Sequence, residues 1–476
     1  MARAIPSLIT AALLAGCSLA PPMHAPQIAA GDAYKETGPW TRAQPADRLP
    51  RDSWWQLYET PEIDALEKQL IDGNPNLAAA LANYAQARAL SAQARAGLFP
   101  QLGLNAGVSR ARESAHAPLI GPTTPRYYDD NTLSGTVSYE LDLWGRIRNQ
   151  VKAGEANAQA AALDLENARL SLLAQMVDDY VQLRSLDRES AILDDTVKAY
   201  DRAVTLTEQR HGAGIAAGLD VAQAQTQLDA ARAQAAQVLA QRALMEHAIA
   251  ALLGVSASTF SISPAIVAIK QPGIPTGVPT TLLERRPDIA GAQRRMIAAN
   301  ANIGVARAAY FPSLTLAGQG GVQSTAFSNW LTAPSTFWAI GPNAVLTLFD
   351  GGLHRAQVAQ ARAEFDASSA DYRAVVVAAF QQVEDSLASL HHYYDAAQQE
   401  RAAVDAAQRT LDLSMALYKQ GAADYLTVVT SQTALLQAQL QGLTLDTLQL
   451  KASVDLIRAL GGGWQDNERL ASANAH

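Results

Sequence analysis

The residues of this sequence that are best suited to chemistry are its eight histidines and its single cysteine, Cys17. Two histidines can bind one metal from a helix when they lie four residues apart, because that spacing puts both on one face. His391 and His392 are adjacent, so they point to different faces, and the other histidines show no metal-binding spacing either. The sequence also contains no Ser-His-Asp arrangement, phosphate-binding glycine loop or HExxH motif. We therefore expect no catalytic residue, no metal site, no cofactor and no enzyme activity.

The composition narrows the class of protein. Of the 476 residues, 49% are hydrophobic and 17% are charged, so the chain can form a sizeable core. A net charge of −8 argues against nucleic acid as a partner, since phosphate binding requires basic stripes. After the N-terminus there is no run of about 18 apolar residues, so we expect no transmembrane helix. If this protein spans a membrane, it must do so with β-strands.

Residues 1–16 have the pattern of an export signal. Arg3 supplies a positive charge, an apolar stretch follows it, and two small residues precede Cys17. A buried N-terminal helix is the alternative, but Pro6 and the prolines after Cys17 oppose it. Because residues 17–60 are rich in proline, we expect them to form a strap that runs along the body of the protein.

The string Leu14-Ala15-Gly16-Cys17 resembles the lipobox of bacterial lipoproteins. This resemblance implies that the signal is cut before Cys17, which then carries the fatty acyl chains, such as palmitate, as the first residue of the mature chain. Several acyl chains on one residue anchor a protein far better than one chain does. Ser18 stands where inner-membrane retention signals often have aspartate, and this favours delivery to the outer membrane.

The sequence is internally duplicated. The segment around Pro75 recurs around Pro287, at a spacing of 212 residues. Gly214–Leu219 recurs as Gly421–Leu426, at a spacing of 207 residues. Such repeats constrain the architecture before local structure is considered. We therefore divide the chain into a first repeat, an inter-repeat linker in the equatorial region, a second repeat and a C-terminal tail, at 61–254, 255–281, 282–461 and 462–476.

Each repeat shows the same predicted order of elements: a first helix, two strands, a very long proline-free helix and a final helix. The strands alternate apolar and polar residues, as in a membrane barrel, although a half-buried sheet of a soluble domain would fit each strand equally well. At about 60 residues, each long helix would span roughly 100 Å, which favours a coiled coil or helical tunnel. The first helices are expected at 61–96 and 282–309, the strand pairs at about 101–112 with 132–144 and about 312–323 with 337–349, and the long helices at 146–210 and 352–418.

Glycines mark the points where the second strand of each pair leads into the long helix. Gly145 lies at this point in the first repeat, and Asp350, Gly351 and Gly352 lie there in the second. Glycine permits a tight turn and aspartate can cap the helix that follows, so we assign these residues a structural role. The predicted fold is mainly α-helical with a small β part and an internal two-fold repeat.

Several ordered motifs resemble those of outer membrane factors, the TolC-like outer membrane efflux proteins, and especially their OprM- and NodT-like lipoprotein branch. The resemblance covers nearly the whole mature chain. The motifs that carry it are Trp54–Tyr58, Leu282–Ile289, Ile303–Pro312, Leu348–Gly352 and Tyr418–Leu426.

This resemblance implies a lipid-anchored homotrimer in the bacterial outer membrane, with a long α-helical barrel that extends into the periplasm. It implies a passive export duct, coupled to a periplasmic adaptor (membrane fusion) protein and an inner-membrane pump of the RND class. An oligomer is also required on physical grounds, because four strands cannot close a barrel and lipid does not tolerate open edges. Three chains would give 12 strands, whereas the eight strands of two chains would leave no water-filled channel. A structural or adhesive coiled-coil lipoprotein remains the alternative.

The same resemblance implies a closed aperture at the periplasmic helix turns. Leu219 and Leu426 match the hydrophobic constriction of the family. Thr430 stands where the family often has an acidic residue, so the usual carboxylate ring is absent at that level. Asp220 and Asp424 lie nearby and could replace it, or they could be solvated helix caps.

Lipidation at Cys17 is testable directly. Cys17→Ser should abolish incorporation of radiolabelled palmitate, because the acylated thiol is gone. Unchanged labelling of the variant would contradict the lipobox assignment.

Overall fold

The computed structural model describes residues 18–23, 26, 34–35, 53–114, 126–274 and 286–462. The predicted signal segment, Cys17, most of the strap at 17–60, residues 275–281 of the linker and the tail after residue 462 lie outside the described residues. The chain divides into two compact units. Unit 1 comprises residues 1–27, 83–162 and 291–373, and unit 2 comprises residues 28–82, 163–290 and 374–476.

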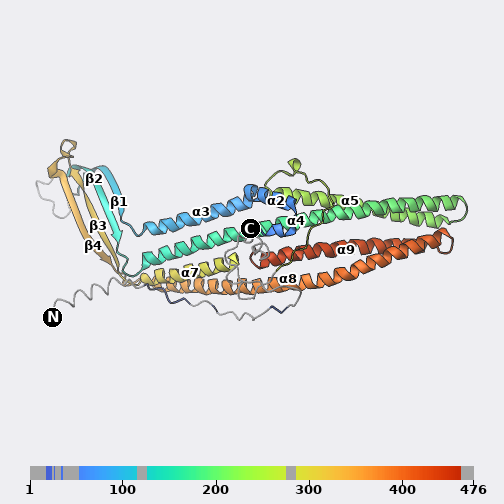
Figure 1. The fold of residues 1–476 in the computed structure, drawn as a ribbon. Helices are drawn as coiled ribbons and strands as arrows, with labels where there is room; N and C mark the ends of the chain where they lie inside the picture. Colours follow the sequence, from blue (N-terminus) through green and yellow to red (C-terminus); the bar gives the residue numbers. More distant parts are fainter. Residues whose placement is uncertain are drawn as a thin grey trace, which may run out of the picture. The chain divides into compact units, whose positions relative to one another are not determined.

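The described residues form a mostly helical fold with one sheet (Figure 1). Corresponding helices of the two repeats have equal lengths. This confirms the predicted fold class and two-fold repeat. The 22-residue helices are α3 (Pro75–Ala96) and α7 (Pro287–Ala308), the 67-residue helices are α4 (Arg146–Gly212) and α8 (Leu353–Lys419), and the 35-residue helices are α5 (Gly218–Leu252) and α9 (Tyr425–Ala459).

The prediction of one continuous helix over 61–96 was wrong, because the helix is interrupted at Asn74. It forms α2 (Pro61–Gly73) and then α3. Pro75 has no N–H and disfavours helical backbone at the preceding residue, and Asn74 is accordingly extended. Short 3-10 helices are η1 (Trp54–Tyr58), η2 (Ala257–Thr259), η4 (Phe327–Asn329) and η5 (Ala333–Ser335).

Four antiparallel strands form one sheet in the order β1-β2-β3-β4. The strands are β1 (Gln101–Arg112), β2 (Tyr127–Glu140), β3 (Ser313–Ser324) and β4 (Thr336–Val345). Two of the predicted strands have different bounds in the structure. The strand expected at 132–144 begins earlier, because Tyr127 pairs with the end of β1, and it ends before Asp142, which caps α4. The strand expected at 337–349 ends at Val345, which pairs with the first residue of β3.

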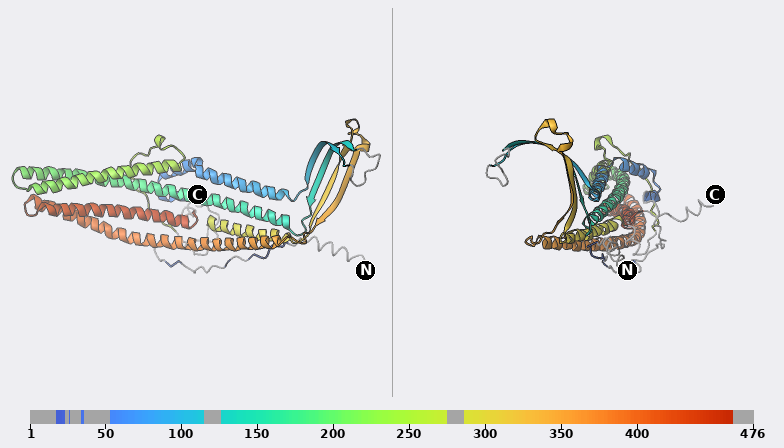
Figure 2. Two further views of the ribbon diagram at one scale, coloured as in Figure 1. Left: turned by 180° about the vertical axis from the view of Figure 1, so that it is seen from behind. Right: turned by 90° about the vertical axis from the view of Figure 1, so that its left-hand side faces the viewer.

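The register places apolar side chains of all four strands on one face of the sheet. Leu102 pairs with Val137, and in the next pair of strands Val137 is opposite Gly318, which pairs with Ile340. Residues directly opposite each other share a face. Their neighbours, such as Thr136, therefore form a second face that is mainly polar, and the curvature of the sheet is visible in Figure 2.

A side-chain-to-backbone hydrogen bond joins two helix ends at the equivalent place in each repeat. Asn74 Nδ2 donates to Leu252 O at 2.7 Å, and Arg286 Nη1 donates to Ala459 O at 3.0 Å. Both donors stand directly before the proline that begins α3 or α7, and both acceptors lie at the end of α5 or α9. Last-turn carbonyls have no partner within their own helix, so each bond satisfies one of them. Together these contacts define what we term the helix joints.

The main core lies in unit 2, where η1 and α2 pack on α4, α8 and α9. Tyr58 is fully buried and its hydroxyl lies 2.8 Å from Ser453 Oγ. Glu67 is buried beside this core, and burial raises the pKa of its carboxyl to about 9, so it is protonated at neutral pH. Among the described helices, none is long and apolar enough to cross a membrane.

The first helix joint can be tested with a matched pair of glycines. Gly254 and Gly214 have φ of 72° and 74°, so alanine strains the backbone equally at both, by about 1–2 kcal/mol. A Cβ on Gly254 would also lie 2.3 Å from Gly73 O, whereas a Cβ on Gly214 meets no atom within 4 Å. Gly254→Ala should therefore lower the thermal midpoint of the circular dichroism signal well beyond Gly214→Ala. Equal losses would show that the joint is not tightly packed.

Candidate functional site

The turns between α4 and α5 and between α8 and α9 have the same backbone geometry. Gly214 and Gly421 both have φ of 74°. Gly214 N donates to His211 O, and Gly421 N donates to Tyr418 O in the same way. A left-handed residue after a helix is strongly favoured to be glycine, which explains why both repeats carry it.

Leu219 and Leu426 are the second residues of α5 and α9, directly after these turns. These two residues are 66% and 52% exposed in the single chain, so they do not belong to its core. Large exposed apolar side chains at equivalent ends of a repeat are available for contacts between chains. Their role in a constriction stays a prediction.

The polar candidates have different surroundings. Asp424 is the N-cap of α9, where its carboxylate accepts from Thr427 N at 3.0 Å and from Thr427 Oγ1 at 2.6 Å. These bonds hold the pKa of Asp424 below its ordinary value. Thr430 Oγ1 donates to Thr427 O within its own helix. Asp220 lies in the first turn of α5, near the tyrosines described next.

A cluster of aromatic residues and one arginine, which the sequence analysis missed, joins the two turns. The Arg210 guanidinium lies 4.8 Å from the ring centroid of Tyr418, and its Nη1 donates to Lys419 O at 3.2 Å. The rings of Tyr418 and Tyr425 lie 5.2 Å apart and are both buried. Burial raises the pKa of Tyr425 to about 12, and the charge of Asp220 adds to this shift. The end of α4 is thereby held to the end of α8.

Departures from the repeat could have revealed this cluster. Shifted by 207 residues, Arg210 corresponds to Leu417, and Tyr425 corresponds to Gly218. A cation and a large aromatic side chain therefore appear where the other repeat has neither. Such differences indicate positions at which one repeat has a contact that the other lacks.

Both strand-to-helix turns in unit 1 contain glycines with positive φ. The value is 73° at Gly145, 65° at Gly351 and 96° at Gly352. The Asp350 carboxylate accepts from Gly352 N at 2.8 Å and from His354 N at 2.9 Å, and these bonds lower its pKa. In this position the carboxylate caps the first turn of α8.

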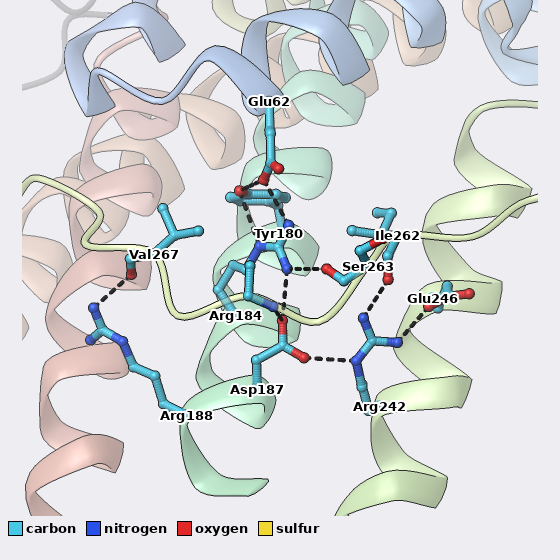
Figure 3. A network of polar contacts seen from close by, with 11 residues as sticks. Glu62, Tyr180, Arg184, Asp187, Arg188, Arg242, Glu246, Ile262, Ser263 and Val267 are labelled. Carbon is cyan, nitrogen blue, oxygen red and sulfur yellow. Dashed lines mark hydrogen bonds and ion pairs between the residues drawn. The ribbon is translucent and has the colours of Figure 1, made fainter. Parts of the chain in front are cut away.

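An extensive polar network in unit 2 attaches the linker to the helices (Figure 3). At its centre Arg184 of α4 is buried, and its Nη2 donates to Glu62 Oε2 at 2.7 Å. Arg184 Nη1 donates to Asp187 Oδ2 at 2.7 Å and to Ser263 O at 2.9 Å. Tyr180 donates to the same Glu62 carboxylate, and this bond is the main cause of the lowered pKa of Glu62.

Arginines on two helices bind backbone carbonyls of the linker. Arg188 Nη2 donates to Val267 O at 2.6 Å, and Arg242 of α5 donates to Ile262 O. The Asp187 carboxylate accepts from Arg242 Nε at 2.7 Å and from Ala265 N at 3.1 Å. Bonds to charged groups are stronger than neutral ones, so this network fixes an otherwise irregular segment on the helices.

In the part of the chain that the structure describes, the second repeat has no such network at the corresponding positions. The counterparts of Arg184, Asp187 and Arg242 are His391, Tyr394 and Gln449. The network joins residues of three separate helices and backbone carbonyls of the linker, so no spacing in the sequence could predict it. The rings of His391 and His392 are tilted against each other with centroids 5.1 Å apart, and the described residues include no group of three side chains suited to a metal ion.

Comparisons with known proteins agree with this architecture. The family model described as Outer membrane efflux protein matches residues 66–255 and 278–462. The chain is 30% identical to the antibiotic efflux pump outer membrane protein ArpC of Pseudomonas putida, covering 100% of this chain and 99% of ArpC. It is 33% identical to the pyoverdine export outer membrane protein OpmQ of Pseudomonas putida, covering 89% and 90%. The structure of the outer-membrane channel OprN is similar, with a TM-score of 0.85, 29% identity, and coverage of 94% and 100%.

The repeat counterpart of Arg184 supplies the control for a test of the linker network. Arg184→Met leaves the buried Asp187 with one arginine fewer, and breaking a buried ion pair costs about 3–5 kcal/mol. The variant should therefore unfold at a clearly lower temperature by circular dichroism. His391→Met, at the equivalent and more exposed position, should change the midpoint little. A similar midpoint for both variants would contradict the role of the network.

Proposed function

We propose that this chain, which belongs to the outer membrane efflux protein family, is the passive trimeric duct of a tripartite efflux system, held in the outer membrane by a lipidated Cys17. The observation that carries the proposal is the four-stranded sheet, with one continuous apolar face and no partner for the outer edges of β1 and β4 among the described residues. Three copies joined edge to edge would close a 12-stranded barrel, and their long helices would continue as a helical barrel.

The chain is an outer-membrane component of an efflux system, and the structural or adhesive alternative has no support among the named relatives. A passive duct cannot drive transport, so an inner-membrane pump of the RND class and a periplasmic adaptor would supply the energy and the connection. We assign no catalytic step to the duct. ArpC is named for antibiotics and OpmQ for pyoverdine, so similar ducts serve chemically different substrates.

We place the closed aperture at the periplasmic turns, with Leu219 and Leu426 as an apolar ring around the trimer axis. Their exposure in the single chain supports this assignment. An apolar constriction resists wetting and therefore ion passage. Because the carboxylate of Asp424 is engaged as a helix cap, Asp220 is the better candidate for charge in the residual pore. The contact of Arg210 with Tyr418 would hold the turns in the closed arrangement.

Single-channel recording tests this aperture. Leu219→Ser together with Leu426→Ser should raise the conductance in planar bilayers and the leakiness of cells to bulky antibiotics, because a polar ring wets readily. The trimer should persist in gel filtration, since exposed leucines do not support the core.

Leu239→Ser with Leu244→Ser provides the control, because these leucines are 57% and 68% exposed and lie in the second half of α5, far from the turns. This pair should leave the conductance unchanged. If the first pair lowers only thermal stability and leaves conductance unaltered, Leu219 and Leu426 stabilise the turns and do not form the constriction.

A further inference from the structure

We propose that unit 1 contains a seat for the first residues of the mature chain, formed by Asn149 of α4 and by Asn300, Gly304 and Arg307 of α7. The seat would fix the point at which the N-terminal acyl chains enter the membrane. This inference rests on the proposed lipid anchoring at Cys17. It concerns the protein surface that receives the residues after the cysteine, which is separate from the acylation itself.

Three polar side chains of the two helices hold the segment that follows Cys17. Two of the three bonds are accepted by backbone carbonyls, so the seat recognises the course of the chain more than its side chains. The bonds are Ser18 Oγ to Asn149 Oδ1 (3.0 Å), Arg307 Nη1 to Leu19 O (3.1 Å) and Asn300 Nδ2 to Pro21 O (3.0 Å).

The two asparagines of the seat are almost fully buried. Asn149 and Asn300 are only 3% and 4% exposed. Each already has one amide atom, Asn149 Nδ2 and Asn300 Oδ1, without a hydrogen-bond partner among the described residues. A buried polar group that loses its partner is destabilising. Without the seated segment, both asparagines would lose the bond that they now make with it.

Gly304 allows the segment to approach α7. A Cβ at this position would lie 2.9 Å from Ala20 N and 2.5 Å from Asn149 Nδ2. In the first repeat the corresponding residue is Ala92, and the counterpart of Asn300 is Arg88. The seat is therefore a feature that one repeat has and the other lacks, which indicates a specific occupant.

The direction of the segment is also determined. Arg307 lies one residue before the end of α7, close to the start of β3, and Asn300 lies two turns further back, about 10 Å away. Since Leu19 is bound at Arg307 and Pro21 at Asn300, the chain end that bears Cys17 is directed toward the strands. The seat thus delivers the acyl anchor to the membrane end of unit 1.

A disulfide across the seat tests this proposal in the full-length protein. Ser18→Cys and Asn149→Cys introduce two thiols where the side chains now form a hydrogen bond. Mild oxidation should join them in most molecules, seen as a mobility shift on non-reducing gels and as a linked peptide by mass spectrometry. A lipid-modified Cys17 has no free thiol to compete, and the same spectra report its modification.

Adding Gly304→Ala to the pair should lower the disulfide yield about fivefold or more, because the new methyl group displaces the segment. Gly442→Ala is the matched control, since its Cβ would meet no atom closer than 3.7 Å and it gives the same gain in helix propensity. No disulfide, or a yield that Gly304→Ala leaves unchanged, would overturn the seat. A disulfide together with unmodified Cys17 would retain the seat and refute the lipid anchor.

Discussion

The outer edges of β1 and β4 have no backbone partner among the described residues, and the rest of the architecture follows from this constraint. Unsatisfied N–H and C=O groups are not tolerated in lipid, so a sheet with an apolar face and open edges is incomplete as a single chain. The trimer that we propose joins each β1 to the β4 of a neighbouring copy. It also brings three equivalent sets of helix turns around one axis, as the proposed aperture requires.

Duplication provides the regular part of the structure, and departures from it mark the specialised parts. The repeats share the helix joints at Asn74 and Arg286, because each repeat must connect the ends of helices that have the same lengths. Among the described residues, the Arg184 network, the Arg210 cluster and the seat at Gly304 each occur only once. Duplicated helices can pack in the same way in both repeats. The linker, the joined helix turns and the N-terminal segment are not duplicated, so each needs contacts of its own.

The sequence was sufficient to predict the duplication, the mostly helical class and the existence of four strands, because prolines and glycines recur at fixed spacings and the strands alternate clearly. It was insufficient at the break at Asn74, where the long apolar pattern concealed the effect of Pro75. Arg184 and Arg210 were missed for a different reason. Their partners include backbone carbonyls and a tyrosine ring on distant segments, which no periodicity reports. The roles of Leu219 and Leu426 remain predictions, because they depend on contacts between copies.

The mass of the detergent-extracted, purified protein, measured by light scattering with correction for bound detergent, tests the central claim most directly. Closure of the open edges of β1 and β4 predicts a protein mass of three chains that does not fall on dilution. A stable monomer would mean that the sheet edges are satisfied in another way. That result would contradict the barrel, the duct and the aperture together.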